Sequence, residues 1–273
     1  MKPTLSQVCS LNSPFEQDIK DYAAGKCPAV EVWLTKLEAY LESNTTDDVR
    51  RLLDENEIAA PVASFQGGLL SSQGEARDEA WKLFTRRMDL CREIGAETIV
   101  VACDVSAPLS QQVIDRSRAS LRQIADESER CGVRVAVEFQ ATSALGNNLQ
   151  SGLALLEEVD SPHLGVCLDA FHFYVGPSKS EDLGQLTAAN LFHVQLCDIA
   201  DVPRELAMDS DRILPGEGDI PLAPIIERLH AIRYQRCVSI ELMNPQIWHV
   251  PPVQFGEVAI TALRSLLGLA SME

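Results

Sequence analysis

The feature that most constrains the fold of this chain is a regular alternation of short β-rich runs with longer amphipathic stretches. Segments such as Gln73–Gly95 and Pro108–Cys131 place their apolar residues at helical spacing. The runs between such segments are five or six residues long and rich in aliphatic side chains. There are eight of them: Leu5–Cys9, Ala29–Leu34, Ala60–Phe65, Thr98–Cys103, Arg134–Phe139, Leu164–Leu168, Leu191–Leu196 and Val238–Leu242.

This alternation predicts an α/β fold with a parallel sheet. Near-continuous apolar strands joined by crossover helices are typical of sheets that helices cover. Eight such units in 273 residues match a closed (β/α)8 TIM barrel, and we predict a single domain over residues 1–273. The alternative is a doubly wound open sheet. No strand, however, is followed by the G-x-G-x-x-G or G-x-x-x-x-G-K-[ST] turns that bind phosphate in such folds.

Charge and hydropathy exclude several classes of partner. With 23 basic and 40 acidic residues the chain carries a net charge of −17, which repels nucleic acids and anionic membrane surfaces. The apolar stretches are far shorter than the ~20 residues that span a bilayer, and the N-terminus lacks the pattern of a secretory signal. None of the eight cysteines forms a C-x-x-C pair, so we expect reduced thiols and a cytoplasmic protein.

Polar residues close four consecutive predicted strands, the fifth to the eighth. They are Glu138, Asp169, Gln195 and Glu241. In a TIM barrel the carboxyl ends of the strands converge on the active site. A single buried carboxylate there is explained by a salt bridge or a helix cap, but four oxygen donors on consecutive strands favour a shared divalent cation.

Three further residues are candidates for contact with a substrate. His172 follows Asp169 by three positions, where its side chain could donate to a substrate oxygen. His193 lies two residues before Gln195, on the same strand face but deeper, and is either a hydrogen-bonded core histidine or a functional one. Arg212 precedes a Pro-Gly turn and either neutralises the acidic site or holds a substrate oxygen.

Two aromatic segments could border the same site. Trp33 and Phe65 close the second and third predicted strands, and each is read either as a pocket wall or as an ordinary core or turn residue. Trp248 and His249 follow Glu241 in a proline-rich loop, where they could cover the site or pack at a subunit interface.

Several of these motifs occur together in one known superfamily. The chain resembles the xylose-isomerase-like TIM-barrel superfamily of sugar and sugar phosphate isomerases and epimerases, and within it the inosose (2-keto-myo-inositol) isomerases most closely. The residues that carry the resemblance are Val137-Glu138-Phe139, Leu168-Asp169-Ala170-Phe171-His172-Phe173, His193-Val194-Gln195-Leu196-Cys197-Asp198, Asp211–Gly218 and Val238-Ser239-Ile240-Glu241. Together these motifs are specific, and each alone is weak.

The resemblance implies roles for individual residues. Glu138, Asp169, Gln195 and Glu241 would be the ligands of one divalent cation, and Glu138 and Glu241 the proton-transfer groups. His172 and Arg212 would contact the substrate, with His193 as a further candidate. Inosose isomerases have histidine at the place of Gln195, whereas glutamine at this place resembles hydroxypyruvate isomerase and the bacterial dehydroshikimate dehydratases of the same superfamily. The amide oxygen of Gln195 favours Mn²⁺ or Mg²⁺, with Zn²⁺ and Co²⁺ as alternatives.

The chemistry that fits is proton removal next to a carbonyl through an enediolate. We therefore predict a metal-dependent isomerase or epimerase acting on a small molecule, namely a keto sugar, an inosose or a related polyol. A 3-dehydroshikimate dehydratase-like lyase is the first alternative, and a non-catalytic sugar-binding barrel is an alternative of another class. A nuclease with a three-zinc cluster would need more histidines at strand ends. Whether the chain forms a homo-oligomer is left open.

Overall fold

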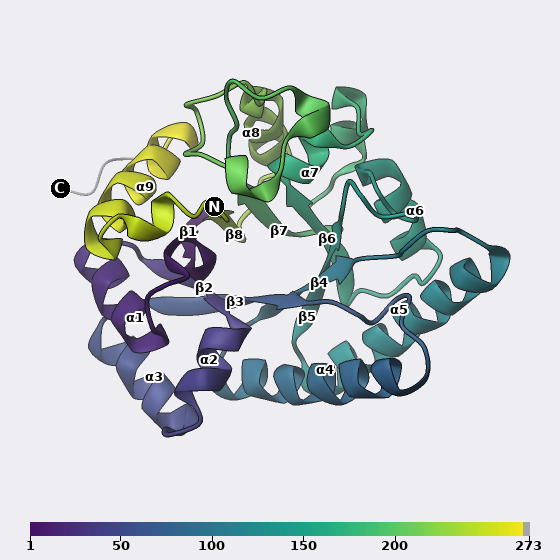
Figure 1. Ribbon diagram of the computed structural model, residues 1–273, viewed down its shortest axis with the longest axis horizontal. Helices are drawn as coiled ribbons and strands as arrows, with labels where there is room; N and C mark the ends of the chain where they lie inside the picture. Colours follow the sequence, from purple (N-terminus) through teal and green to yellow (C-terminus); the bar gives the residue numbers. More distant parts are fainter. Residues whose placement is uncertain (270–273) are drawn as a thin grey trace.

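The computed structural model describes residues 1–269, and within them eight parallel strands close into a barrel. Figure 1 shows the strands at the centre with the helices around them. Each strand pairs with the next along the chain, and β1 pairs with β8 to complete the circle. The strands are β1 (Lys2–Ser6), β2 (Ala29–Trp33), β3 (Ala59–Gln66), β4 (Thr98–Cys103), β5 (Arg134–Phe139), β6 (Leu164–Asp169), β7 (Leu191–Leu196) and β8 (Cys237–Ile240). The predicted (β/α)8 barrel is confirmed.

Helices fill the connections between the strands. The α-helices are α1 (Phe15–Ala24), α2 (Leu34–Tyr40), α3 (Thr46–Glu55), α4 (Gly74–Ile94), α5 (Gln111–Cys131), α6 (Leu149–Glu157), α7 (Ala170–Val175), α8 (Leu222–Ala231) and α9 (Pro252–Leu266). Short 3₁₀ helices are η1 (Gln7–Ser10), η2 (Ser180–Gln185), η3 (Arg204–Leu206), η4 (Asp209–Asp211) and η5 (Ile247–His249). The two longest helices, α4 and α5, end at Gly95 and Gly132, whose positive φ angles of 81° and 70° close each helix in the left-handed conformation.

The first strand differs from the prediction. It covers Lys2–Ser6 rather than Leu5–Cys9, because the chain turns into η1 directly after it. The Ser6 side chain accepts a hydrogen bond from the backbone N–H of Val8 and caps that 3₁₀ helix. The last strand, β8, which pairs with β1, ends at Ile240, so Glu241 is the first residue beyond it.

The barrel interior below the cavity is filled by a small cluster of side chains from six strands. These are Val62, Val100, Ala136, Cys167, Phe192 and Cys237. Phe192 occupies the space opposite Gly165, where an added Cβ would lie 2.4 Å from the ring. This layer closes the bottom of the cavity, and the polar residues at the strand ends lie directly above it. A second and larger apolar cluster includes residues from both the strands and the helices.

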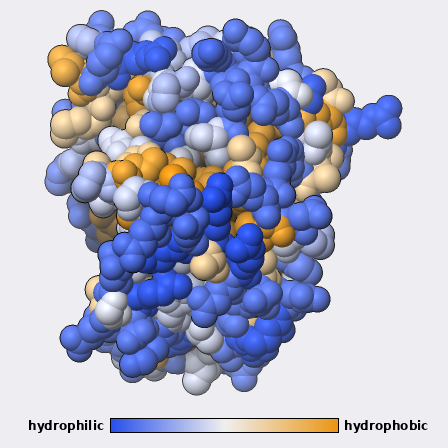
Figure 2. Space-filling view, turned by 90° about the vertical axis from the view of Figure 1, so that its right-hand side faces the viewer, coloured by the Kyte–Doolittle hydropathy of each residue, from blue (hydrophilic) through white to orange (hydrophobic). Residues whose placement is uncertain are grey.

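The outer surface is mostly polar. Hydrophilic residues cover most of the flank shown in Figure 2, with hydrophobic residues in smaller areas between them. All eight cysteines are buried and free, as the sequence predicted. No helix in residues 1–269 is both long enough and apolar enough to cross a bilayer.

Candidate active site at the carboxyl ends of the strands

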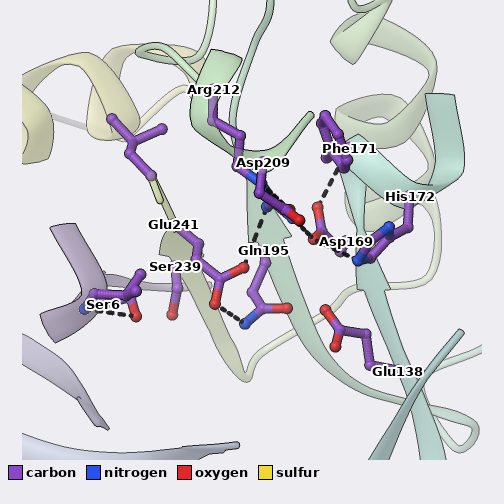
Figure 3. A network of polar contacts seen from close by, with 12 residues as sticks. Ser6, Glu138, Asp169, Phe171, His172, Gln195, Asp209, Arg212, Ser239 and Glu241 are labelled. Atoms are coloured by element: carbon purple, nitrogen blue, oxygen red, sulfur yellow. Dashed lines mark hydrogen bonds and ion pairs between the residues drawn. The ribbon is translucent and has the colours of Figure 1, made fainter. Parts of the chain in front are cut away.

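A cavity of about 780 Å³ opens at the carboxyl ends of the strands, where the sequence predicted the site. Its polar lining comes from β5, β7 and the segments after β5, β6, β7 and β8, and its apolar lining comes from β2, β3, β4, α7 and the segments after β5, β7 and β8. Glu138, His172, Gln195, Arg212 and Glu241 all line it. Asp169 lies fully buried next to Arg212 and His172. Figure 3 shows these side chains converging from neighbouring strands.

Glu138 and Asp169 form one side of the site. Together with His172 they bring one ligand atom each within 4.8 Å of one another. Gln140 Nε2 donates to Glu138 Oε2 at 3.2 Å. Asp169 Oδ1 accepts from the backbone N–H of Phe171 at 2.7 Å and so caps α7, which fixes the carboxylate at the end of β6.

Gln195 and Glu241 form the other side, and the Gln195 amide is held by two carboxylates. Its Nε2 donates to Glu31 Oε1 at 2.9 Å and to Glu241 Oε1 at 2.8 Å. Burial raises the pKa of Glu31, but the adjacent His193 together with Ser239 and Ser64 outweighs burial and holds that pKa below its usual value. The ionised Glu31 only accepts hydrogen bonds, so the amide nitrogen faces it and the amide oxygen faces away. In Figure 3 that oxygen points to the side of Glu138.

Arg212 crosses the site and joins its acidic groups. Nη2 lies 2.7 Å from Asp169 Oδ2 and 2.7 Å from Asp209 Oδ1, and Nη1 lies 3.2 Å from Glu241 Oε2. The guanidinium carbon lies 4.5 Å from the ring centroid of Phe171, and the residue is only 1% exposed. Arg212 and Asp169 form an ion pair but no hydrogen bond, since Asp169 Oδ2 has no hydrogen-bond partner.

The loop that carries Arg212 is organised by a buried aspartate, Asp198. Its backbone forms an antiparallel bridge with Ile213, with N–O distances of 2.9 and 2.8 Å. Its carboxylate accepts from the backbone N–H groups of Gly216 and Ile220, both at 2.9 Å. These bonds hold both ends of the turn after Arg212 and so fix where the guanidinium enters the site.

The buried carboxyl groups have strongly perturbed pKa values. Burial and the neighbouring Asp169 raise the pKa of Glu138 to about 8, although Arg212 opposes the shift. Burial also raises the pKa of Glu241 well above its usual value, with Arg212 opposing the shift and Glu31 adding to it. One guanidinium therefore does not compensate the negative charges that this site gathers.

The donor set fits a divalent cation. Buried carboxylates, an amide oxygen and an imidazole are ligands that such ions take in proteins. Oδ2 of Asp169 and Nδ1 of His172 are both buried and have no hydrogen-bond partner. Burial outweighs the nearby Asp169 and lowers the pKa of His172, which favours the neutral ring that a metal ligand must have. A cation would supply the positive charge that the raised pKa of Glu138 shows to be lacking.

Sequence reasoning placed His193 as a candidate for substrate contact, and the structure places it elsewhere. His193 is fully buried below Gln195, does not line the cavity, and has Nε2 2.9 Å from Glu31 Oε2. Glu31 itself was missed, although an acidic residue inside the apolar run of β2 was a signal for it. Asp209, which pairs with Arg212, was also missed and had no comparable signal.

The mouth of the cavity is apolar and aromatic. Trp33 and Phe65 form a tilted ring pair with centroids 5.2 Å apart, and both line the cavity. Met208 and Trp248 line it as well, whereas His249 does not. The reading of Trp33 and Phe65 as pocket-wall residues therefore fits the structure, and Trp248 lines the cavity, as a residue that covers the site would.

Comparison with known proteins gives a family match and several relatives. The family described as xylose isomerase-like TIM barrel matches residues 21–266. The chain is 26% identical over 254 residues to the inosose isomerase of Bacillus velezensis, a match that covers 91% of this chain and 90% of that protein. It is 28% identical over 271 residues to the 3-dehydroshikimate dehydratase of Pseudomonas aeruginosa, covering 95% of this chain and 40% of that protein.

A solved structure supports the fold independently. The crystal structure of the IOLI protein with a bound zinc atom superposes on this chain with a TM-score of 0.92 and 22% sequence identity, covering 100% of both chains. The barrel predicted from the alternating pattern and the resemblance drawn from the strand-end motifs both agree with these matches.

Proposed function

The chain belongs to the xylose isomerase-like TIM barrel family, and from that premise we propose that it is a metal-dependent isomerase or epimerase acting on a keto sugar, an inosose or a related polyol. The observation that carries the proposal is the pair of buried glutamates Glu138 and Glu241. They reach one cavity from β5 and from the end of β8, and the pKa of each is raised. Two such groups at one cavity are suited to removing and returning a proton.

The residues that would hold the cation are Glu138, Asp169, Gln195 and Glu241, with His172 close to the first two. When bound, a divalent cation supplies the positive charge that stabilises developing negative charge on a substrate oxygen. The carboxylate and amide oxygens favour Mn²⁺ or Mg²⁺, with Zn²⁺ and Co²⁺ as alternatives.

The proton transfer is assigned to the two glutamates. One of Glu138 and Glu241 removes the proton next to the substrate carbonyl, which gives an enediolate, and either the same or the other carboxyl returns a proton to the neighbouring carbon or the opposite face. In the metal-free protein burial and Asp169 raise the pKa of Glu138 to about 8, and a bound cation would lower that pKa and favour the carboxylate form that accepts a proton. His172 lines the cavity with a neutral ring, and it orients a substrate oxygen.

Dehydration is the second candidate. The match to the dehydratase of Pseudomonas aeruginosa extends over 95% of this chain, and a hydroxyl on the carbon beyond the enediolate would leave as water. The same glutamates would serve this reaction. The nature of the substrate therefore separates the two candidates.

The test is a substrate screen with the Mn²⁺-loaded protein. Inososes, neutral keto sugars and 3-dehydroshikimate are incubated in D₂O and followed by NMR for isomerised, epimerised or dehydrated products and for deuterium next to the carbonyl. We expect exchange and product with at least one neutral ketone, and loss of both in Glu138→Gln and Glu241→Gln. Binding of a ketone without exchange in the wild-type protein would instead support a non-catalytic sugar-binding barrel.

A further inference from the structure

We propose that the η1 turn positions Glu241, and that it does so through the thiol of Cys9. This role rests on the proposed function, because Glu241 is a proton-transfer group only there, and it adds a residue that reaches neither substrate nor metal. Cys9 is 1% exposed and does not line the cavity, whereas Glu241 does. Three features carry the proposal: the early end of β1, the two hydrogen bonds of the thiol and the buried carboxylate that anchors η1.

The pairing of β1 with β8 stops just before Glu241. The last paired residue of β8 is Ile240, and one further pair would set Ser6 opposite Glu241. In a parallel ladder the backbone oxygen of Ser6 would then accept from the N–H of Leu242. The chain instead turns into η1 after Ser6, whose backbone oxygen accepts from the Tyr22 hydroxyl at 3.3 Å. The segment that carries Glu241 therefore continues without a strand partner on the β1 side.

The thiol of Cys9 takes the place of the missing partner. The N–H of Leu242 donates to Cys9 Sγ at 3.2 Å, and the thiol donates to the backbone oxygen of Ile240 at 3.5 Å. A neutral thiol can do both, since it has one S–H and a sulfur that accepts. These two backbone groups flank Glu241, whose own N–H donates to the backbone oxygen of Leu196 at 3.1 Å. The backbone around Glu241 is therefore held from both sides, by β7 and by Cys9.

The turn that presents Cys9 is anchored by one buried carboxylate, that of Asp18. Its Oδ2 accepts from Gln7 Nε2 at 3.1 Å, and its Oδ1 accepts from Ser10 Oγ at 2.8 Å. Gln7 and Ser10 are the first and last residues of η1, so both ends of the turn are fixed to the same group. Asp18 is fully buried, and Lys36 Nζ lies 2.5 Å from its Oδ2 and supplies the opposite charge that a buried carboxylate needs.

The same turn also holds two residues of the cavity mouth. Trp248 Nε1 donates to the backbone oxygen of Val8 at 2.8 Å, and the backbone N–H of Trp33 donates to Gln7 Oε1 at 3.0 Å. Both tryptophans line the cavity. The η1 turn therefore joins the end of β2 to the segment after β8 along one side of the site.

The side-chain bonds of Glu241 depend on where its backbone lies. Its Oε1 accepts from Gln195 Nε2 at 2.8 Å, and its Oε2 accepts from Arg212 Nη1 at 3.2 Å. Figure 3 shows the Glu241 carboxylate meeting the amide of Gln195. A shift of the Glu241 backbone would change both distances at once. Cys9 is therefore a positioning residue, which acts on the reaction only through the residue that it holds in place.

The first test needs no reaction. Hydrogen exchange of single backbone amides is measured by NMR in the wild type, Cys9→Ala and Cys9→Ser. We expect a protected Leu242 amide in the wild type, and exchange about 3- to 10-fold faster in Cys9→Ala, which removes the acceptor. Cys9→Ser should lie closer to the wild type, because a hydroxyl also donates and accepts. An unprotected Leu242 amide in the wild type would overturn the proposal.

A matched control separates this role from the loss of any buried thiol. Cys27 is buried and outside the cavity lining, and its Sγ donates to the backbone oxygen of Gly256 at 3.6 Å. Cys27→Ala should leave the protection of Leu242 at the wild-type level. Equal loss of that protection in Cys27→Ala and Cys9→Ala would reduce the effect to packing and overturn the proposal.

The second test measures solvent-deuterium exchange of a neutral ketone with the Mn²⁺-saturated proteins. We expect Cys9→Ala to lower kcat about 10-fold or more with a much smaller change in KM, because the displaced group is the one that moves the proton. Cys9→Ser should recover most of that rate, and Cys27→Ala should keep it. A wild-type kcat in Cys9→Ala would overturn the proposal. If no ketone exchanges in the wild type, the proposed function fails, and the Leu242 amide still decides whether Cys9 holds this backbone.

Discussion

The substitution Glu31→Gln tests how the Gln195 amide is oriented. Glu31 is fully buried and accepts from Gln195 Nε2 at 2.9 Å, so that the amide oxygen points away from it. A glutamine at position 31 can donate as well as accept, and the amide of Gln195 is then free to turn over. The predicted consequence is weaker metal binding without loss of any of the four proposed ligands.

The magnitude follows from the bond that is lost. A hydrogen bond to a charged group contributes about 1.5–3 kcal/mol, which corresponds to roughly 10- to 100-fold in a binding constant. The loss of an outer-shell partner of a metal ligand has effects of about the same size. We therefore expect the Kd for Mn²⁺ to rise by about 10- to 100-fold in Glu31→Gln.

The assay is a Mn²⁺ titration followed by electron paramagnetic resonance, with the thermal unfolding temperature measured in parallel. Glu31→Asp keeps the charge but shortens the reach, so weaker binding in both variants identifies the hydrogen bond, and weaker binding only in Glu31→Gln identifies the charge. Glu38→Gln is the matched control, because Glu38 pairs with Arg87 and does not line the cavity. Wild-type affinity in a folded Glu31→Gln protein would refute the reasoning.

Three further predictions follow from the same structure. Gln195→His should shift metal preference toward Zn²⁺ or Co²⁺, since an imidazole nitrogen replaces an amide oxygen; an unchanged order in competition titrations would remove Gln195 from the ligand set. Gly165→Ala should lower the free energy of unfolding in urea by about 1–3 kcal/mol, because the new Cβ would lie 2.4 Å from Phe192, whereas Gly184→Ala, with no atom within 4 Å, should cost much less. The pKa of Glu138 is raised from 4.5 to about 8, so the folded protein binds this proton more tightly than the unfolded chain does. The free energy of unfolding of the metal-free protein should therefore fall as pH rises through this interval. Glu138→Gln should flatten that slope in urea unfolding at several pH values, and an unaltered slope would argue against the raised pKa.

The barrel could be predicted because its signal is local and repeated. The near-continuous apolar strands and the helical periods recur along the chain, and the polar residues at positions 138, 169, 195 and 241 each lie at or next to the end of a visible apolar run. The first strand was misplaced because Val8 and Cys9 are apolar and β-prone and extend the run beyond Ser6, where the strand ends. The conformation of Gln7–Ser10 is set by the Ser6 cap and by Gln7 Nε2, which donates to Asp18 Oδ2 at 3.1 Å.

The remaining parts of the site depend on contacts between distant segments. Glu31 and Gln195 are 164 residues apart in sequence and meet only because β2 and β7 face one barrel interior. The position of Arg212 depends on Asp198 and on a loop between β7 and α8, which carries no periodic signal. Residue type and spacing identified Arg212 as a candidate. That it forms ion pairs with three carboxylates could be seen only in the structure.

The central claim is that Glu138 and Glu241 transfer the proton in one metal-holding cavity. Its most direct test is the rate at which solvent deuterium enters the carbon next to the carbonyl of a neutral inosose, measured by NMR with Mn²⁺-loaded wild type and Glu241→Gln. An amide can ligate a metal but cannot act as a base at neutral pH, so we predict exchange in the wild type and none in a variant that still binds Mn²⁺. Exchange at the wild-type rate in metal-loaded Glu241→Gln would contradict the account.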